Sequence, residues 1–166
     1  MKLTELFRSL SEEQVRYVLV GGLAIQLHGF MRATFDIDLV LDMDDENLER
    51  FLTVARQYSL VPGIPVPIEA IKDADQLERW HREKGMLAFS LREPSAGGNV
   101  VDILVRPAVP FDQLIDNAIH GELFGKQILI ASIEDLLEMK RIANRPKDQL
   151  DIAALEKIKR GENPNA

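Results

Sequence analysis

Acidic and aliphatic residues alternate in the segment Asp36-Ile37-Asp38-Leu39. Successive side chains of a β-strand point to opposite faces, so this alternation predicts a strand with Asp36 and Asp38 on one face and Ile37 and Leu39 in the core. Two carboxylates held this close repel each other unless a positive charge lies between them. Mg²⁺ binds to one or two carboxylates together with substrate phosphates. The segment therefore indicates a metal site or, more simply, a solvated strand edge.

Two glycines come before this strand and directly after another predicted one. Residues 15–20, VRYVLV, are rich in β-branched and aromatic residues and predict a buried strand that ends at Gly21 and Gly22. Residues 23–28 then predict a helix. Such a turn brings backbone N–H groups to a helix N-terminus, which suits phosphate, but a tight turn alone also needs glycine. The Gly-Lys-Ser/Thr sequence of a Walker loop is absent.

A third carboxylate interrupts an apolar strand. Asp102 lies in residues 100–105, VVDILV. A charge among apolar residues is costly unless it is paired or binds a metal. The alternative is an edge-strand aspartate that faces water. With the apolar run at 86–91 and the flexible segment 94–99, this strand predicts a β-hairpin.

The other segments predict helices among a few strands. Apolar spacing and acidic first turns predict helices over residues 3–10, 44–58 and 75–84, and a fifth strand over 127–130. Ser132 caps the next helix, with Asp135 at the capping-box position; Asn144 ends it, and Pro146 starts the last one. The class is α/β or α+β, a small mixed sheet flanked by helices. We expect one domain over residues 1–160 and a polar tail at 161–166.

Composition narrows the classes of function. A net charge of −7 argues against binding of nucleic acid through a broad basic surface, although a local basic groove is compatible with this charge. The absence of cysteine excludes disulfides and thiolate sites. No apolar stretch approaches the ~20 residues of a membrane span, and the first residues do not form a signal peptide. We therefore expect a cytoplasmic protein with no membrane partner.

Taken together, the motifs resemble those of the nucleotidyltransferase superfamily, which has the DNA-polymerase-beta-like fold. The chain is most similar to the small bacterial and archaeal group related to the AbiEii/AbiGii toxins. The resemblance covers residues 15–155. The matching motifs are residues 18–24, VLVGGLA; residues 32–38, with Arg32, Thr34 and both aspartates; residues 132–140, SIEDLLEMK; and residues 145–155, with Arg145-Pro146-Lys147-Asp148 and Asp151.

The resemblance implies roles for particular residues. It implies that two ions, Mg²⁺ or Mn²⁺, bind with a nucleoside triphosphate to three catalytic carboxylates: Asp36, Asp38 and Asp102. It places the Gly21-Gly22 turn against phosphate and Lys140, a further catalytic residue, near the triphosphate. Other residues expected to contact the nucleotide are Arg32, Thr34 and Asp148, although the specific role of Asp148 stays open. Dipole compensation at a helix end would also explain Lys140.

Two functions follow as hypotheses. The first is transfer of a nucleoside monophosphate from a nucleoside triphosphate to a hydroxyl of an RNA end, a protein or a small molecule, in the toxin-like half of a toxin–antitoxin pair with an antitoxin-like partner. The second is a non-catalytic module of the same fold that binds a partner or regulates it. Retention of all three carboxylates, the glycine turn and Lys140 favours the enzyme. The nucleotide, the acceptor and the roles of Trp80 and residues 62–84 stay open.

Overall fold

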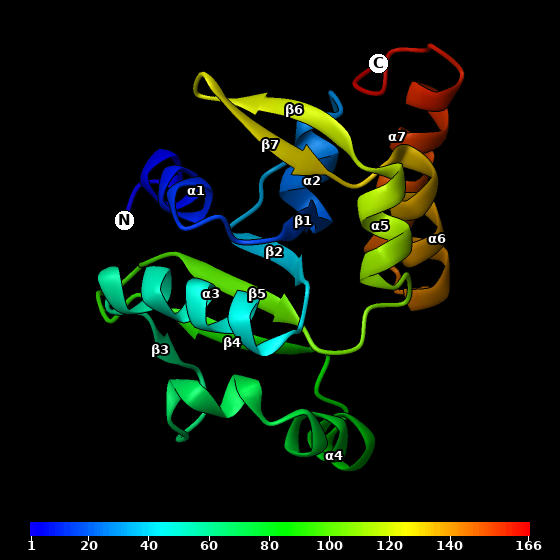
Figure 1. The fold of residues 1–166 in the computed structure, drawn as a ribbon. Helices are drawn as coiled ribbons and strands as arrows, with labels where there is room; N and C mark the ends of the chain where they lie inside the picture. Colours follow the sequence, from blue (N-terminus) through cyan, green and yellow to red (C-terminus); the bar gives the residue numbers. More distant parts are fainter.

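The strand that carries Asp36 and Asp38 lies in the middle of a seven-stranded mixed sheet (Figure 1). The computed structural model describes residues 1–166. The strand order is β3-β4-β5-β2-β1-β7-β6. The strands are β1 (Tyr17–Val20), β2 (Asp36–Leu41), β3 (Val61–Pro62), β4 (Ala88–Arg92), β5 (Val100–Leu104), β6 (Ile119–Leu123) and β7 (Lys126–Ile130). Strands β2 and β5 are parallel, as are β1 and β7, and the other neighbours are antiparallel. The predicted class, a mixed sheet with helices, is confirmed.

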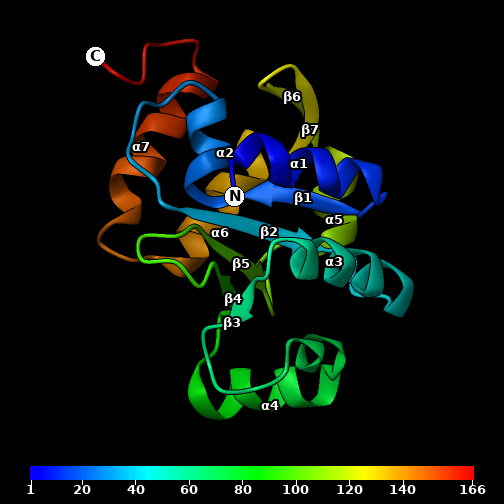
Figure 2. The same cartoon turned by 90° about the vertical axis from the view of Figure 1, so that its left-hand side faces the viewer.

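Seven α-helices and one 3-10 helix surround the sheet. They are α1 (Leu3–Glu12), α2 (Gly21–Leu27), α3 (Asp45–Gln57), η1 (Ile68–Lys72), α4 (Ala74–Lys84), α5 (Phe111–Asn117), α6 (Ile133–Ala143) and α7 (Asp148–Lys159). Helices α6 and α7 pack side by side next to α5, and α4 lies at the opposite end of the molecule (Figures 1 and 2). None of the helices is long and apolar enough to cross a membrane.

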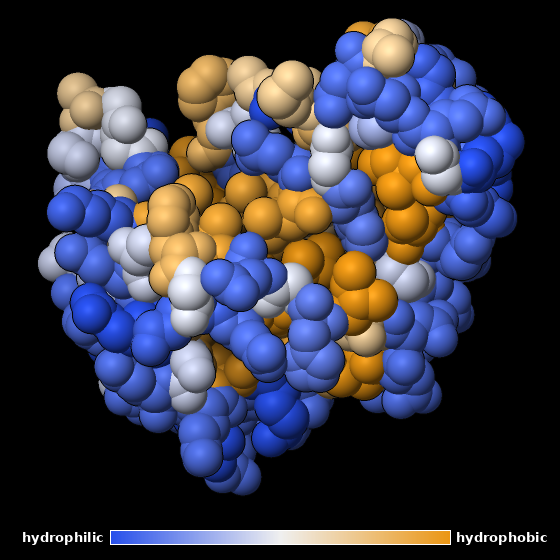
Figure 3. Space-filling view, turned by 90° about the horizontal axis from the view of Figure 1, so that it is seen from above, coloured by the Kyte–Doolittle hydropathy of each residue, from blue (hydrophilic) through white to orange (hydrophobic).

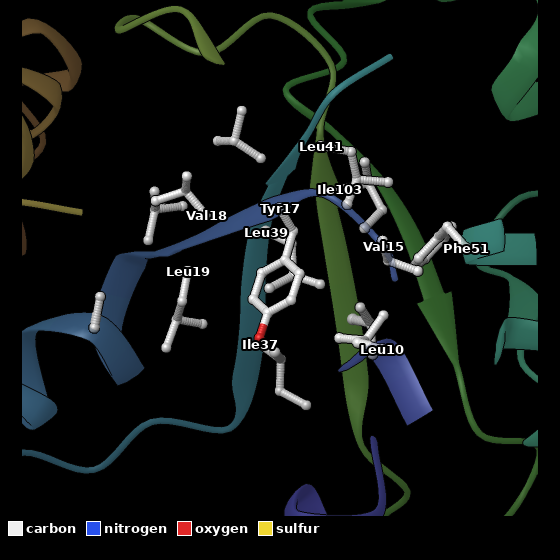
Figure 4. Packing of buried hydrophobic residues seen from close by; sticks show 14 of the residues in the cluster. Leu10, Val15, Tyr17, Val18, Leu19, Ile37, Leu39, Leu41, Phe51 and Ile103 are labelled. Carbon is white, nitrogen blue, oxygen red and sulfur yellow. The ribbon is translucent and has the colours of Figure 1, made fainter. Parts of the chain in front are cut away.

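Alternation along the central strands places the large core residues and the aspartates of β2 on opposite faces. Tyr17 of β1 pairs with Leu41 of β2, and Leu19 pairs with Leu39, so these side chains share one face. Figure 4 shows them with Ile103 of β5, close to residues of α1 and α3. The aspartates of β2 lie on the other face because they occupy the alternate positions. Burial of the core face therefore fixes which face presents the carboxylates.

Local signals in the sequence explain several helix ends. The side chains of Asp44, Asp73 and Ser132 each accept a hydrogen bond from the backbone N–H three residues later, which caps α3, α4 and α6. Helix α6 ends at Asn144, which adopts the left-handed conformation, as predicted. The predicted cap at Ser132 is confirmed. The side chain of Asp135 does not complete a capping box and instead accepts hydrogen bonds from α5.

Some sequence predictions need correction. The glycines Gly21 and Gly22 form the first turn of α2 itself, so this helix spans residues 21–27 rather than 23–28. Trp80, whose role the sequence left open, packs partly buried against the hydrophobic core. Helix α5 and strand β6 had no prediction at all.

The β6–β7 hairpin forms the end of the molecule that Figure 3 shows from above. Hydrophobic surface is visible in the middle of this face, between hydrophilic margins. The hairpin exposes Ile119 and Phe124. The polar tail after α7 is held by Asn165, which bonds to the backbone of Gly29 and Met31.

Candidate active site

Strand register places two carboxylates side by side. Strands β2 and β5 run parallel, and Asp38 is the direct partner of Asp102. Asp36 shares the face of Asp38, because it lies two residues earlier on the same strand. Asp36 is exposed, whereas Asp38 and Asp102 are partly buried. All three acids therefore lie on one face of two adjacent strands.

The environment of these acids disfavours their ionised forms. Burial, together with the negative charges of Asp102 and Asp36, raises the pKa of Asp38 from 3.8 to about 6, although Lys140 and the backbone N–H of Gly22 oppose the shift. Burial also raises the pKa of Asp102, against a hydrogen bond from Ser90 and with a further contribution from Asp36. Like charges in a partly desolvated site attract a cation or a proton. The site therefore has the electrostatic character of a cation-binding cluster.

The carboxylates do not form a complete metal shell by themselves. No group of three or more His, Cys, Asp or Glu side chains is arranged closely enough to hold an ion unaided. The donors present are carboxylate oxygens on an open face, which fit Mg²⁺ or Mn²⁺ rather than zinc. Phosphate oxygens of a bound nucleotide are the kind of ligand that completes such a shell.

The glycine turn lies directly against Asp38. Gly21 has a φ of +68°, and a Cβ atom there would lie 2.0 Å from a carboxylate oxygen of Asp38. A Cβ on Gly22 would lie 2.7 Å from Oγ1 of Thr34 and 3.4 Å from the guanidinium carbon of Arg32. Only glycine permits both the backbone conformation and the close approach. The turn thus brings backbone and carboxylate together at the first turn of α2.

A group of basic residues next to the acids is held by two buried aspartates. Nζ of Lys140 lies 3.0 Å from Oδ1 of Asp148 and 2.9 Å from Oδ2 of Asp151. Nε of Arg145 lies 2.9 Å from Oδ2 of Asp148, and Arg32 pairs with Asp151. The side chain of Asp148 is 0% exposed and that of Asp151 is 4% exposed. These aspartates are compensated by hydrogen-bonded cations, as buried charges must be.

The basic group acts electrostatically on the acidic one. Lys140 lowers the pKa of Asp38. The pKa of Arg145 is raised, chiefly by its hydrogen bond to Asp148 and also by the charge of Asp38. Burial alone would raise the pKa of Asp148, but hydrogen bonds from Arg145 and Lys140 outweigh it and lower the pKa to about 2. Asp148 is therefore an ionised anchor for two cations.

The structure brings the residues selected from the sequence into one region, but Asp148 has a different environment from the one expected. Asp148 was expected to contact nucleotide, but its carboxylate is buried and occupied by Lys140 and Arg145. The sequence reasoning assigned no site role to Arg145 or Asp151. The signal was present in the spacing Arg145-x-x-Asp148-x-x-Asp151, which places both acids on one helical face.

Ser90 is a further polar residue that the sequence reasoning missed. It lies on β4 as the partner of Asp102, and its hydroxyl donates a hydrogen bond to Oδ1 of that residue. Such a bond fixes the orientation of a carboxylate in a site with few other donors. A serine in a strand that alternates apolar and polar residues carries no distinguishing pattern of its own, so only the strand pairing identifies it.

The arrangement of strands and helices is a nucleotidyltransferase fold. The structure is similar to a crystal structure of ANT(2″)-Ia in complex with adenylyl-2″-tobramycin, with a TM-score of 0.61, 13% sequence identity and coverage of 96% of this chain and 87% of that chain. At this identity the likeness concerns the fold.

A sequence comparison identifies the family. The family described as "Nucleotidyl transferase AbiEii toxin, Type IV TA system" matches residues 4–166. The chain therefore belongs to the AbiEii family of nucleotidyltransferases. A search of curated proteins found no significant match. The resemblance seen in the sequence is confirmed, and membership supports nucleotidyl transfer as the activity.

Proposed function

We propose that this chain is a metal-dependent nucleotidyltransferase that moves a nucleoside monophosphate from a nucleoside triphosphate to a hydroxyl acceptor. The observation that carries the proposal is the pairing of Asp38 with Asp102 on adjacent parallel strands, with Asp36 on the same face. The raised pKa values of Asp38 and Asp102 support it, because burial and neighbouring like charges favour a bound cation at such a cluster. A non-catalytic module would have no reason to retain this unfavourable arrangement.

Asp36, Asp38 and Asp102 would hold two divalent cations, Mg²⁺ or Mn²⁺, together with the triphosphate. When bound, the ions supply charge neutralisation at the phosphates and activation of the acceptor hydroxyl. Because the carboxylates alone do not form a ready-made shell, we expect metal and nucleotide to bind cooperatively.

The protein's own groups orient the reactants. Lys140 and Arg145 direct positive charge toward the triphosphate, and Asp148 and Asp151 hold them there. The acceptor oxygen bonds to the α-phosphorus, the bond from that phosphorus to the bridging oxygen breaks, and pyrophosphate leaves with the negative charge. Asp102 takes the proton of the acceptor hydroxyl, and burial, which raises its pKa, makes it a better base.

Gly21 and Gly22 bring backbone N–H groups to the phosphates, at the turn where side chains are excluded. Arg32 and Thr34 lie against Gly22 and shape the same turn. In this proposal, the glycine turn and the basic group contact the two ends of the triphosphate, and the acids lie between them.

A binding screen followed by a transfer assay tests the proposal. Each of the four nucleoside triphosphates is titrated against the protein in a thermal-shift assay with Mg²⁺, with Mn²⁺ and with chelator. We expect stabilisation by at least one triphosphate that requires a divalent ion and disappears in Asp38→Asn, whereas Asp116→Asn on α5, an exposed control, behaves as wild type. Stabilisation that is equal with chelator would refute metal dependence.

We further propose that the chain is the toxin of a type IV toxin–antitoxin pair, and this rests on the family description. Induced expression in a bacterial host should arrest growth, and Asp38→Asn, produced at the same level, should not. Arrest of growth by both forms would separate toxicity from nucleotidyl transfer and reject this role.

A further inference from the structure

Strand β6 is an open edge of the sheet. It is the last strand in the order, and its one neighbour is β7. No backbone hydrogen bond joins it to any other segment of the chain. Figure 1 shows β6 on the outer side of the β6–β7 hairpin, and Figure 2 shows this hairpin projecting from the body of the molecule. Such an edge presents N–H and C=O groups with which a further strand can pair.

The turn of the hairpin determines which backbone groups face outward. The two turn residues, Phe124 and Gly125, have φ values of +52° and +75°, as a type I′ turn requires. In a hairpin with this turn, the two residues that flank it bond to each other, and every second residue of the strand does the same. The intervening residues of β6, His120 and Glu122, therefore direct their N–H and C=O groups to the open edge.

The bonding between β7 and β1 supports the same alternation. The backbone N–H of Ala131 donates to the carbonyl of Leu19 at 3.0 Å, so Ala131 bonds toward β1. Ile130, one residue earlier, then bonds toward β6, where its partner is Ile119. Residues of β6 with odd numbers therefore bond to β7, and those with even numbers face outward.

The sequence of β6 is complementary to itself in one antiparallel register. Two copies related by a two-fold axis form hydrogen bonds when outward-facing residues lie opposite each other. If the axis passes Gly121, His120 lies opposite Glu122 of the second copy, and the symmetry repeats this pair. An imidazole N–H donates a hydrogen bond to a carboxylate. All five residues of the strand overlap in this register.

The neighbouring registers lack this complementarity. An axis at His120 places the two imidazoles opposite each other and leaves Glu122 opposite Ala118. An axis at Glu122 places two carboxylates opposite each other, and like charges in that position are destabilising. The register with its axis at Gly121 is therefore the favoured one.

The same register also covers apolar side chains. Ile119, which is 43% exposed, lies opposite Leu123 of the second copy, in a pair without mutual hydrogen bonds, where side chains are closest. Gly121 faces itself across the axis, so no side chain separates the strands there. Phe124, which is 66% exposed, lies next to Ala118 of the second copy. These residues belong to the end of the molecule on which Figure 3 shows hydrophobic surface.

We propose that the chain forms a two-fold dimer in which β6 pairs antiparallel with β6 of a second copy. The two seven-stranded sheets then form one continuous sheet. His120 and Glu122 fix the register, and their polarity disfavours pairing with strands of other sequence. The proposal concerns assembly and does not depend on the proposed transfer reaction.

Charge-exchange variants test the pairing. Glu122→Lys removes the acceptor of the imidazole, and His120→Glu places two carboxylates opposite each other. Because the axis repeats each change, at least two hydrogen bonds are lost, and the dimer dissociation constant should rise about tenfold or more. The double variant His120→Glu/Glu122→His exchanges the partners and should restore the wild-type constant. Glu83→Lys makes the same change of charge at an exposed position of α4, at the opposite end of the molecule, and serves as the control.

Sedimentation equilibrium of the full chain over a series of concentrations measures the dissociation constant, and circular dichroism checks that each variant is folded. We expect a monomer–dimer equilibrium for the wild type, the double variant and Glu83→Lys, shifted toward monomer in the two single edge variants. A wild type that stays monomeric throughout, or single edge variants that dimerise as tightly as the wild type, would overturn the proposal.

Cross-linking tests the register, since the chain has no cysteine of its own. In Ile119→Cys/Leu123→Cys the introduced thiols lie opposite each other across the interface, whereas within one strand they are too far apart for a disulfide. We expect this variant to give a covalent dimer on mild oxidation. His120→Cys, which reports the register with its axis at residue 120, should give little. A cross-link that forms more readily in His120→Cys, or in neither variant, would refute the pairing about Gly121.

Discussion

Replacement of Asp38 by asparagine should stabilise the metal-free protein at neutral pH. Burial and the charges of Asp102 and Asp36 raise the pKa of Asp38 from 3.8 to about 6. A difference of about two pKa units corresponds to a cost of about 3 kcal/mol for ionising this group in the folded state. Asparagine removes the charge and keeps an acceptor oxygen, so we expect a gain of about 1–3 kcal/mol in the free energy of unfolding at pH 8.

The sign of the effect determines its pH window. The folded-state pKa lies above the unfolded one, so the folded protein holds the proton more tightly. Above about pH 6 the group is ionised in both states and the full cost applies; below about pH 4 it is protonated in both and the cost vanishes. The difference between Asp38→Asn and wild type should therefore be largest at pH 8 and fall toward zero as the pH falls from 6 to 4.

Urea unfolding in chelator at pH 8 and pH 4 measures the difference in the free energy of unfolding. In a chain of this size, the Tm should rise by about 2–4 °C for each kcal/mol of added stability. Asp36→Asn is the matched control, since it makes the same chemical change on the same face at an exposed position and should stabilise less. The variant should at the same time lose the Mg²⁺-dependent response to triphosphate. Lower stability of Asp38→Asn than of wild type at pH 8 would refute the interpretation of an electrostatically unfavourable site.

Other predictions follow from the same region. Lys140→Ala should lower triphosphate affinity or turnover per folded molecule about ten- to a hundred-fold, and unchanged activity per folded molecule would assign Lys140 to the structure alone. Asp148→Asn should lose about 2 kcal/mol of stability above pH 4, because the pKa of Asp148 is lowered to about 2, and the difference should shrink as the pH falls from 4 to 2; a constant difference in urea unfolding would contradict this. Gly21→Ala should destabilise the fold by at least about 1–2 kcal/mol, because residue 21 has a positive φ. It should also weaken Mg²⁺–triphosphate binding, because the added Cβ displaces Asp38. An unchanged affinity in calorimetry would show that the close contact between Gly21 and Asp38 is not needed for binding.

The central strands could be predicted because their patterns are local. The alternation around Asp36 and Asp38 and the apolar run around Asp102 each determine a strand and a face without knowledge of the rest of the chain. Strand β6 could not be predicted in this way. Its residues are mostly exposed, so burial imposes no alternating pattern on it, and pairing with β7 is what makes it a strand.

The basic half of the site depends on tertiary contacts that no local pattern reveals. Residues 145–151 have the composition of a charged helix start, and the side chains of such a segment are ordinarily expected to face solvent. In the structure Asp148 and Asp151 are buried, because Lys140 from the preceding helix and Arg32 from a distant loop satisfy them. The identity of the partners, rather than the charge itself, decides whether an acid lies inside or outside.

The anchoring of three basic residues by α7 also determines when the basic group can form during translation. A nascent chain that has emerged only as far as Asn144 already contains the strands with all three carboxylates of the proposed metal site. It still lacks Asp148 and Asp151, so Lys140 and Arg32 have no buried partners to orient them. The positive side of the site is completed only when the last helix folds back onto α6. In a chain that ends before its final helix, the basic half of the proposed site would therefore lack the buried aspartates that hold it.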